Sequence, residues 1–262
     1  MNSDLIINNN EGILEITFNK PERKNAITRA MFEKILETLK QNIHHKDLRA
    51  IFISGSGDAF SAGGDVKDMA SKKDLGSLQE KTQSLRNLME ISKILYTSPV
   101  PTVAIVNGVA AGAGLALSLS CDFRISTEHG KFTTAFSKVG FSGDFGISYF
   151  LSKLVGVSKA KELLYFSDVI DGTKALSLGI VNFLIDSNEI KNYSDSLKNK
   201  FKNMPPIAIK YMKKNLNNTD YENLETCLDQ EALYQMICSE TEDHKNAVLA
   251  FVNKEKVAFK GK

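Results

Sequence analysis

Two glycine-rich segments of this chain could do chemistry with their backbone amides alone. The first is FSAGGD at residues 60–65, which follows a predicted strand, and the second is NGVAAGAG at residues 107–114, between a predicted strand and a predicted helix. Small residues let the backbone approach a ligand closely, and N–H groups at the start of a helix point outward. Two such N–H groups directed at one oxygen would form an oxyanion hole, in which one donor is worth roughly 2.7–4 kcal/mol in a transition state. Composition alone favours the alternative, in which both segments are tight turns and close-packed helix starts.

The elements that would position these segments alternate between strands and helices. Short apolar runs predict strands at residues 13–18, 49–54, 102–106 and 122–126. The spacing of apolar residues predicts helices from the N-cap Thr28 to about residue 43, over residues 76–96 and over residues 112–120. This alternation is typical of a parallel sheet with right-handed crossover connections.

The C-terminal part of the chain has a different pattern, which begins near residue 157. Helices are predicted at residues 157–167, 172–178, 187–202, 206–217 and 221–253. One apolar, strand-like piece interrupts them at Ile180–Ile185. We therefore expect a helical C-terminal region after an α/β core.

The composition argues against several function classes. The chain has 262 residues, and its 33 Lys+Arg against 31 Asp+Glu give a net charge of +2, which offers no electrostatic basis for binding nucleic acid. Its three cysteines form no CxxC pair, and its four histidines lack metal-ligand spacing. The N-terminus shows no signal peptide, and glycines interrupt the longest apolar stretch, residues 100–119. We predict a cytoplasmic protein that holds no metal and does not enter a membrane.

Several ordered motifs make the sequence similar to the crotonase superfamily, also called enoyl-CoA hydratase/isomerase. They are NKPERKNA at 19–26, FSAGGDV at 60–66, PTVAIVNGVAAGAGLALSLSCD at 101–122, KFTTAFSKVGFSGDFG at 131–146 and ALSLGIVN at 175–182. The resemblance covers nearly the whole chain. It implies an α/β fold with a crotonase-like core of repeated ββα units over residues 1–195. It also implies a helical C-terminal trimerisation region over residues 196–262, in a homotrimer or a dimer of trimers.

The same resemblance implies that the substrate is an acyl-CoA thioester and that no separate cofactor is needed, because coenzyme A is part of the substrate. Gly64 and Ala113 match the positions whose backbone N–H groups bind the thioester oxygen. The positions that match substrate contacts are Arg23, Lys24, Ala26, Ala62, Asp65, Met69, Ala116, Phe136, Phe141, Phe259 and Lys262. Of these, Arg23, Lys24 and Ala62 lie where the family meets the CoA nucleotide. Phe259 and Lys262 belong to a C-terminal tail that in the family reaches CoA, often from a neighbouring subunit.

The sequence departs from a typical hydratase of this family at two positions. Such an enzyme carries two glutamates that orient a water molecule and shuttle its protons, and the matching residues here are Ala116 and Phe136. Neither side chain can donate or accept a proton. One acid remains nearby, Asp144, at the position of the base in dienoyl-CoA isomerases and in the ring-epoxide isomerases of phenylacetyl-CoA breakdown. If the neighbouring phenylalanine rings face it, desolvation should raise its pKa toward the range of a general base.

A structural role is the alternative for Asp144. An aspartate just before residues 145–147 is a good N-cap for a helix that starts there. The family spacing favours a catalytic role over this one. Asp65, in the first glycine segment, has a similar alternative, which is to support its own loop.

The favoured reaction is isomerisation of an unsaturated acyl-CoA, in which Asp144 moves a proton between two carbons of an enolate. Hydration with Asp144 as the only acid–base group is the first alternative. A nucleophilic Asp144, as in the aryl-CoA dehalogenases, is disfavoured because those enzymes also use a tryptophan, and this chain has none. The third alternative is a non-catalytic scaffold that binds acyl-CoA or associates with RNA. The near-neutral net charge gives no support to RNA binding. We also expect Leu88 and Met89 to help form the wall of the acyl pocket.

Overall fold

Among residues 3–65, 76–219 and 221–262, which the computed structural model describes, the strands form two sheets. The larger sheet contains, in spatial order, β1 (Leu5–Asn10), β2 (Ile13–Phe18), β3 (Ala50–Gly55), β5 (Thr102–Val106), β7 (Phe123–Ser126) and β10 (Phe183–Leu184). The smaller sheet contains β4 (Ala59–Ser61), β6 (Val109–Ala111), β8 (Lys131–Thr133) and β9 (Ile170–Asp171). β1 is antiparallel to β2 and β9 is antiparallel to β8, whereas the other strand pairs described here are parallel.

A unit of two strands followed by a helix recurs along the chain. In the three units from β3 to the helix after β8, the first strand joins the larger sheet and the second joins the smaller one, whereas β1 and β2 both belong to the larger sheet. β3 and β4 precede α3 (Leu78–Leu88) and α4 (Glu90–Thr97), β5 and β6 precede α5 (Ala113–Leu119), and β7 and β8 precede α6 (Ile147–Phe166). Apolar periodicity does not reveal the smaller sheet, because its strands have only two or three residues.

The other helices are α1 (Arg29–Asn42), α7 (Gly172–Ser177), α8 (Ile190–Lys202), α9 (Pro206–Asn218), α10 (Leu224–Ser239) and α11 (Glu242–Asn253). The predicted N-cap of α1 is confirmed, since Thr28 Oγ1 accepts a hydrogen bond from the Met31 amide at 3.3 Å. The predicted single helix over 221–253 is wrong. It is divided into α10 and α11 because the Thr241 side chain caps a new helix start.

Three further sequence predictions need correction. The helix predicted over 76–96 consists of two helices, α3 and α4, separated at Met89. No helix is predicted before residue 157, yet α6 starts at Ile147. Gly156, with φ of 76°, interrupts the helical backbone, and the part of α6 that follows it matches the helix predicted over 157–167. The strand-like piece at 180–185 is reduced to the two residues of β10.

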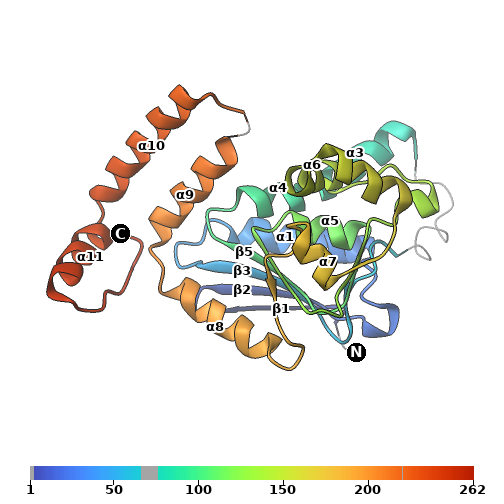
Figure 1. The fold of residues 1–262 in the computed structure, drawn as a ribbon, viewed down its shortest axis with the longest axis horizontal. Coiled ribbons are helices and arrows are strands. Elements are labelled where there is room, and N and C mark those ends of the chain that lie inside the picture. The colour runs from blue at the N-terminus through green and yellow to red at the C-terminus, as the bar shows by residue number, and fades with distance from the viewer. Residues whose placement is uncertain (1–2, 66–75, 220) are drawn as a thin grey trace.

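The larger sheet has a hydrophobic core on each face. The main core lies between this sheet and α1, α4, α5 and α6, where Leu14, Ile16 and Ile51 are fully buried. α8 covers the opposite face, and its Phe201 ring packs 6.2 Å from the ring of Phe52 in β3. Figure 1 shows α8 on one side of the strands and α1, α3, α4, α5 and α6 on the other. The sheet is therefore fixed from both sides, and the loops at its end are held in place.

The C-terminal helices are arranged differently from the rest. In Figure 1, α10 and α11 extend away from the sheets, next to α9. They expose large apolar side chains, among them Leu224, Leu228, Leu233, Met236, Leu249 and Phe251. The division at residue 195 and the role of this region in trimerisation stay predictions. In the described part of the chain, no helix has the length and apolar character needed to cross a bilayer.

Candidate active site

The two glycine-rich segments lie against each other at the ends of β4 and β6. Gly63 has φ of 92°, and a Cβ at this position would lie 2.8 Å from the carbonyl oxygen of Ala111. A Cβ on Gly112 would lie 4.0 Å from the Cα of Gly63. The contact leaves no room for a side chain at Gly63, and the left-handed φ also favours glycine there. The sequence therefore needs glycine here to bring the two backbones together.

Two amide groups at this junction are available to a ligand. Ala113 is the first residue of α5, so its N–H has no acceptor in the preceding turn. Gly64 lies between two residues whose backbones bond to Ile27: the Gly63 carbonyl accepts from the Ile27 amide, and the Asp65 amide donates to the Ile27 carbonyl. Within the described residues, neither the Gly64 nor the Ala113 amide donates to a protein acceptor. Both residues line one cavity, as an oxyanion hole requires.

This cavity has a volume of about 470 Å³ and is mostly apolar. Its wall combines the two glycine segments with side chains from α1, α3 and the segment before α6. The described residues that line it are Ile27, Arg29, Phe32, Ala62, Gly63, Gly64, Asp65, Lys81, Ser84, Leu85, Leu88, Gly112, Ala113, Ala135, Phe136, Val139, Phe141, Asp144 and Phe145. The structure thus brings Gly64, Ala113 and Asp144 together around a single space, as the sequence predicts.

Asp144 points into this cavity and does not cap α6. The N-cap residue of α6 is Gly146, which has φ of 82° and makes no side-chain cap hydrogen bond. Phe145 also has a left-handed backbone, with φ of 46°. These two consecutive left-handed residues separate Asp144 from the first helical turn. The helix-cap alternative for Asp144 is therefore wrong.

The carboxyl group of Asp144 is poorly compensated. Its Oδ1 is buried and has no hydrogen-bond partner among the described residues. Burial raises the pKa of this carboxyl from 3.8 to about 6, because the apolar surroundings disfavour the charged form. A perturbed acid in the wall of a cavity is a candidate for proton transfer.

Aromatic rings surround this acid in part. Phe136 and Phe145 are 6% and 1% exposed, and both line the cavity. The Phe145 ring stacks on the Phe32 ring of α1, with 4.7 Å between ring centroids. Phe141 also lines the cavity but is 57% exposed, so it lies at the edge and excludes less water than the other two.

Asp65 holds the first glycine segment in place by ion pairs. Its Oδ2 lies 2.8 Å from Nη1 of Arg23 and 3.7 Å from Nζ of Lys20, and its side chain is 4% exposed. Lys24 pairs with Asp58 at 2.5 Å. The loop-supporting role of Asp65 that the sequence offers is therefore present, and it fixes Arg23 as well.

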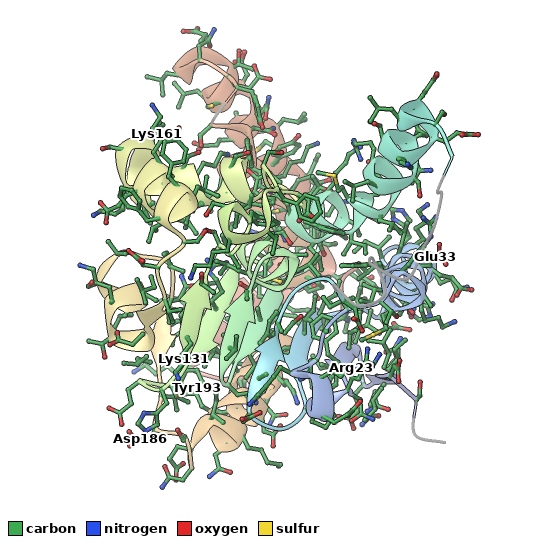
Figure 2. All side chains as sticks on the ribbon, turned by 90° about the vertical axis from the view of Figure 1, so that its right-hand side faces the viewer. Arg23, Glu33, Lys131, Lys161, Asp186 and Tyr193 are labelled. Atoms are coloured by element: carbon green, nitrogen blue, oxygen red, sulfur yellow. The ribbon has the colours of Figure 1, made fainter. Side chains whose placement is uncertain are left out.

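Basic side chains lie on one side of the cavity. Arg29 and Lys81 line it directly, and both are exposed. Arg29 Nε lies 2.8 Å from Glu33 Oε1 on the next turn of α1. Figure 2 shows Arg23 and Glu33 on the same side of the molecule. This arrangement suits a ligand with an apolar part inside the cavity and an anionic part outside it.

The other predicted contacts lie in several places. Ala62 lines the cavity and is exposed. Ala116 is 0% exposed within α5 and is not among the described lining residues. Ala26 follows η1 (Pro21–Arg23) and is also absent from that lining. Met69 lies outside the described residues.

The C-terminal tail is folded back on its own chain. The amides of Lys260 and Gly261 each donate to the Asp243 carboxylate at 2.7 Å, near the start of α11. Phe259 and Lys262 flank these bonds. Figure 1 places this end of the chain far from α3, on the other side of the molecule. Within one chain, the tail does not reach the cavity.

Other polar and sulfur-containing side chains have structural roles. Asp122 Oδ2 accepts hydrogen bonds from the Thr102 amide at 2.8 Å and from Lys213 Nζ at 2.7 Å. Cys121 is 5% exposed and behaves as a small buried side chain. In the part of the chain that the structure describes, no three His, Cys, Asp or Glu residues gather as metal ligands.

Sequence reasoning missed part of the cavity wall. Phe32 and Leu85 lie on helices whose apolar spacing indicates only a core-facing side, and that pattern does not separate core from ligand. Ser84 carries no sequence signal, yet its hydroxyl is buried without a hydrogen-bond partner among the described residues. Leu88 lines the cavity as predicted, whereas Met89 lines a neighbouring one.

Comparison with known proteins gives a consistent family match. The family model for enoyl-CoA hydratase/isomerase matches residues 8–262. The chain is 29% identical over 257 residues to the 1,2-epoxyphenylacetyl-CoA isomerase of Escherichia coli, with 96% of each chain covered. It is 28% identical over 257 residues to the short-chain-enoyl-CoA hydratase of Clostridium acetobutylicum, with 97% of each covered. Similar proteins thus include both isomerases and hydratases.

Solved structures share the fold over nearly their full length. The enoyl-CoA hydratase of Bacillus anthracis superposes with a TM-score of 0.91 at 25% identity, covering 99% of this chain and 100% of that one. A protein from Thermobifida fusca, crystallised in complex with CoA, gives a TM-score of 0.84 at 25% identity, with coverage of 96% and 95%. The predicted α/β fold is confirmed.

Proposed function

Because this chain belongs to the enoyl-CoA hydratase/isomerase family, the crotonase superfamily, we propose that it moves the double bond of an unsaturated acyl-CoA thioester. One observation carries the proposal: the Asp144 carboxyl, whose Oδ1 is buried without a hydrogen-bond partner among the described residues, lines the same cavity as Gly64 and Ala113. One carboxylate suffices to transfer a proton between two carbons. The usual hydration route of the family uses two glutamates, and Ala116 and Phe136 stand in their places.

The proposed reaction proceeds through an enolate. The thioester oxygen accepts hydrogen bonds from the Gly64 and Ala113 amides. The Asp144 carboxylate removes a proton from the α or γ carbon, and the C–H electron pair shifts so that negative charge develops on the thioester oxygen. The two amides stabilise this charge. Asp144, now protonated, returns the proton to the other carbon, so the double bond moves and no atom is gained or lost.

The raised pKa of Asp144 suits the first step of this cycle, the removal of the proton. With a pKa of about 6, the carboxyl is mostly ionised at neutral pH and can accept the proton. The same raised pKa makes it a stronger base than an ordinary aspartate. Phe136 and Phe145, which are 6% and 1% exposed, line the same cavity and make the surroundings of this acid partly apolar.

The basic side chains near the cavity would contact the CoA phosphates. Arg29 and Lys81 line the opening and Arg23 lies beside the first glycine segment. Loss of a phosphate contact should raise the KM for acyl-CoA and change kcat little. The proposed reaction needs no cofactor, since coenzyme A enters as part of the substrate.

Hydration of an enoyl-CoA is the second candidate function. The observation that favours it is the similarity to the short-chain-enoyl-CoA hydratase of Clostridium acetobutylicum. In this reaction Asp144 would act as the only acid–base group. Water addition removes the conjugated double bond, whereas isomerisation creates or moves it, so the two products are distinguished directly.

The test is proton exchange and product analysis with short and medium 2-enoyl-, 3-enoyl- and dienoyl-CoA in deuterated water. We expect deuterium to enter the acyl chain, together with a moved double bond, with wild-type protein, and both to be lost in Asp144→Asn. Equal exchange in the two proteins would refute the role of Asp144. A hydroxyacyl product would favour hydration. Binding of the thioesters without any turnover would favour an acyl-CoA-binding scaffold.

We further propose that the chain assembles as a homotrimer or a dimer of trimers in the cytoplasm. The exposed apolar side chains of α10 and α11 support assembly, since such a surface on one chain favours burial against another. The three free cysteines support a reducing compartment. Sedimentation of the purified protein would test the assembly state.

A further inference from the structure

A second cavity lies beside the candidate acyl-binding cavity. It has a volume of about 430 Å³ and lies among α3, α4, α9 and the start of α6. Aromatic side chains form much of its wall, including Tyr96, Tyr149 and Phe150. The proposed proton transfer uses none of them. The cavity therefore has space for apolar atoms but no role in the reaction described so far.

One residue is shared by the two cavities. Of the described residues that line either space, Phe145 alone lines both. Its side chain is 1% exposed and stacks on Phe32, which belongs to the first cavity. Gly146, the next residue, lines only the second. The chain therefore passes from the first cavity to the second at Phe145, directly after Asp144.

We propose that the Phe145 side chain closes the inner end of the acyl-binding cavity and so sets the longest acyl chain that fits. The second cavity is then the space into which a longer chain extends once this side chain is made smaller. The inference rests on the proposed function only in taking acyl-CoA as the ligand, and it does not depend on which reaction follows.

A substitution in the second cavity should oppose the effect of a smaller side chain at position 145, which is to admit longer acyl chains. Ser92 of α4 lines it, is 4% exposed, and its hydroxyl has no hydrogen-bond partner among the described residues. Replacing this hydroxyl with an apolar side chain breaks no described hydrogen bond. Ser92→Leu should therefore occupy part of the second cavity and leave the first unchanged.

The test measures binding rather than turnover. Saturated acyl-CoA thioesters, which cannot isomerise, are titrated calorimetrically in steps of two carbons from short to long chains. Each buried methylene should tighten Kd about fourfold until the cavity is full. For wild type we expect the gain to stop at a certain length. For Phe145→Ala and Phe145→Leu we expect it to continue over several more carbons. Leucine retains most of the apolar packing, so it serves if the alanine variant does not fold.

Two controls separate this role from general loosening of the core. Phe150→Ala removes a ring that lines only the second cavity, so its length profile should match wild type. Phe145→Ala with Ser92→Leu should reach its limit at a shorter acyl chain than Phe145→Ala alone. A folded Phe145→Ala and Phe145→Leu that stop at the wild-type length would overturn the proposal for Phe145 alone. Absence of binding by wild type at every length would overturn it together with the proposed function.

Discussion

Replacing Asp144 with asparagine should make the folded protein more stable while it abolishes turnover. The pKa of this carboxyl is raised from 3.8 to about 6 by burial, so the ionised form is disfavoured in the folded state. Asparagine has nearly the same shape and carries no charge. The gain in stability therefore measures the free energy that the fold gives up to keep an acid in an apolar wall.

The sign of the pH dependence follows from proton binding. Between pH 4 and 6 the folded protein holds a proton on Asp144 that the unfolded chain has released, so raising the pH through this window removes stability from wild type. The asparagine variant does not titrate there. Its advantage in unfolding free energy should grow from about 1 kcal/mol at pH 4.5 to about 3 kcal/mol at pH 8, at 1.36 kcal/mol for each pKa unit.

The assay is urea unfolding of both proteins at these two pH values. Asp122→Asn is the matched control, because the same substitution there breaks the contact with the buried Lys213. It should destabilise the protein by about 3–5 kcal/mol. A stability gain in Asp144→Asn that is absent, or that does not change with pH, would refute the argument that burial raises this pKa.

Four further outcomes are expected. The rate with a 3-enoyl-CoA should rise with pH to a plateau, with a midpoint near the Asp144 pKa of about 6, and a flat profile from pH 5 to 8 would contradict Asp144 as the base. Ala113→Pro removes one oxyanion amide at a first-turn position that tolerates proline, so kcat should fall about 10²–10³-fold while the melting temperature changes little. Gly63→Ala places a Cβ 2.8 Å from a carbonyl oxygen at φ of 92°, and we expect about 1–3 kcal/mol of destabilisation in urea. Lys213→Met leaves the part-buried Asp122, whose side chain is 22% exposed, without its cation, which should cost about 1–3 kcal/mol in the same measurement.

The elements with strong periodicity or clear caps could be predicted from the sequence. β5 spans residues 102–106 as predicted, and Thr28 caps α1. The smaller sheet could not be found in this way, because strands of two or three residues have no measurable period. In α6 the sequence predicts only the part after Gly156, where the helical backbone is interrupted, and misses the part from Ile147 to residue 155.

The candidate site could be predicted where it depends on glycine. At Gly63 the two backbones lie so close together that no side chain fits between them. Such a requirement can be recognised in the sequence because glycine is the residue that meets it. The direction of the Asp144 side chain could not be predicted, because an aspartate three residues before a helix can cap it or point away from it, and the sequence is the same in both cases. Only the left-handed backbone of Phe145 and Gly146 decides that it points into the cavity. A non-glycine residue in this conformation carries strain that the surrounding packing must compensate.

The left-handed backbone of Phe145 and Gly146 keeps Asp144 from capping α6, and this favours its role as a base. A relaxed helix start would let the carboxylate accept hydrogen bonds from the first-turn amides, which would lower its pKa and make it a poor base. The left-handed backbone at Phe145 prevents this, and the stacked rings of Phe145 and Phe32 hold the backbone in place. The same side chain therefore keeps Asp144 uncompensated and, by our proposal, closes the acyl cavity. A smaller side chain at position 145 should therefore enlarge the acyl cavity and at the same time lower the pKa of Asp144, so that it becomes a weaker base.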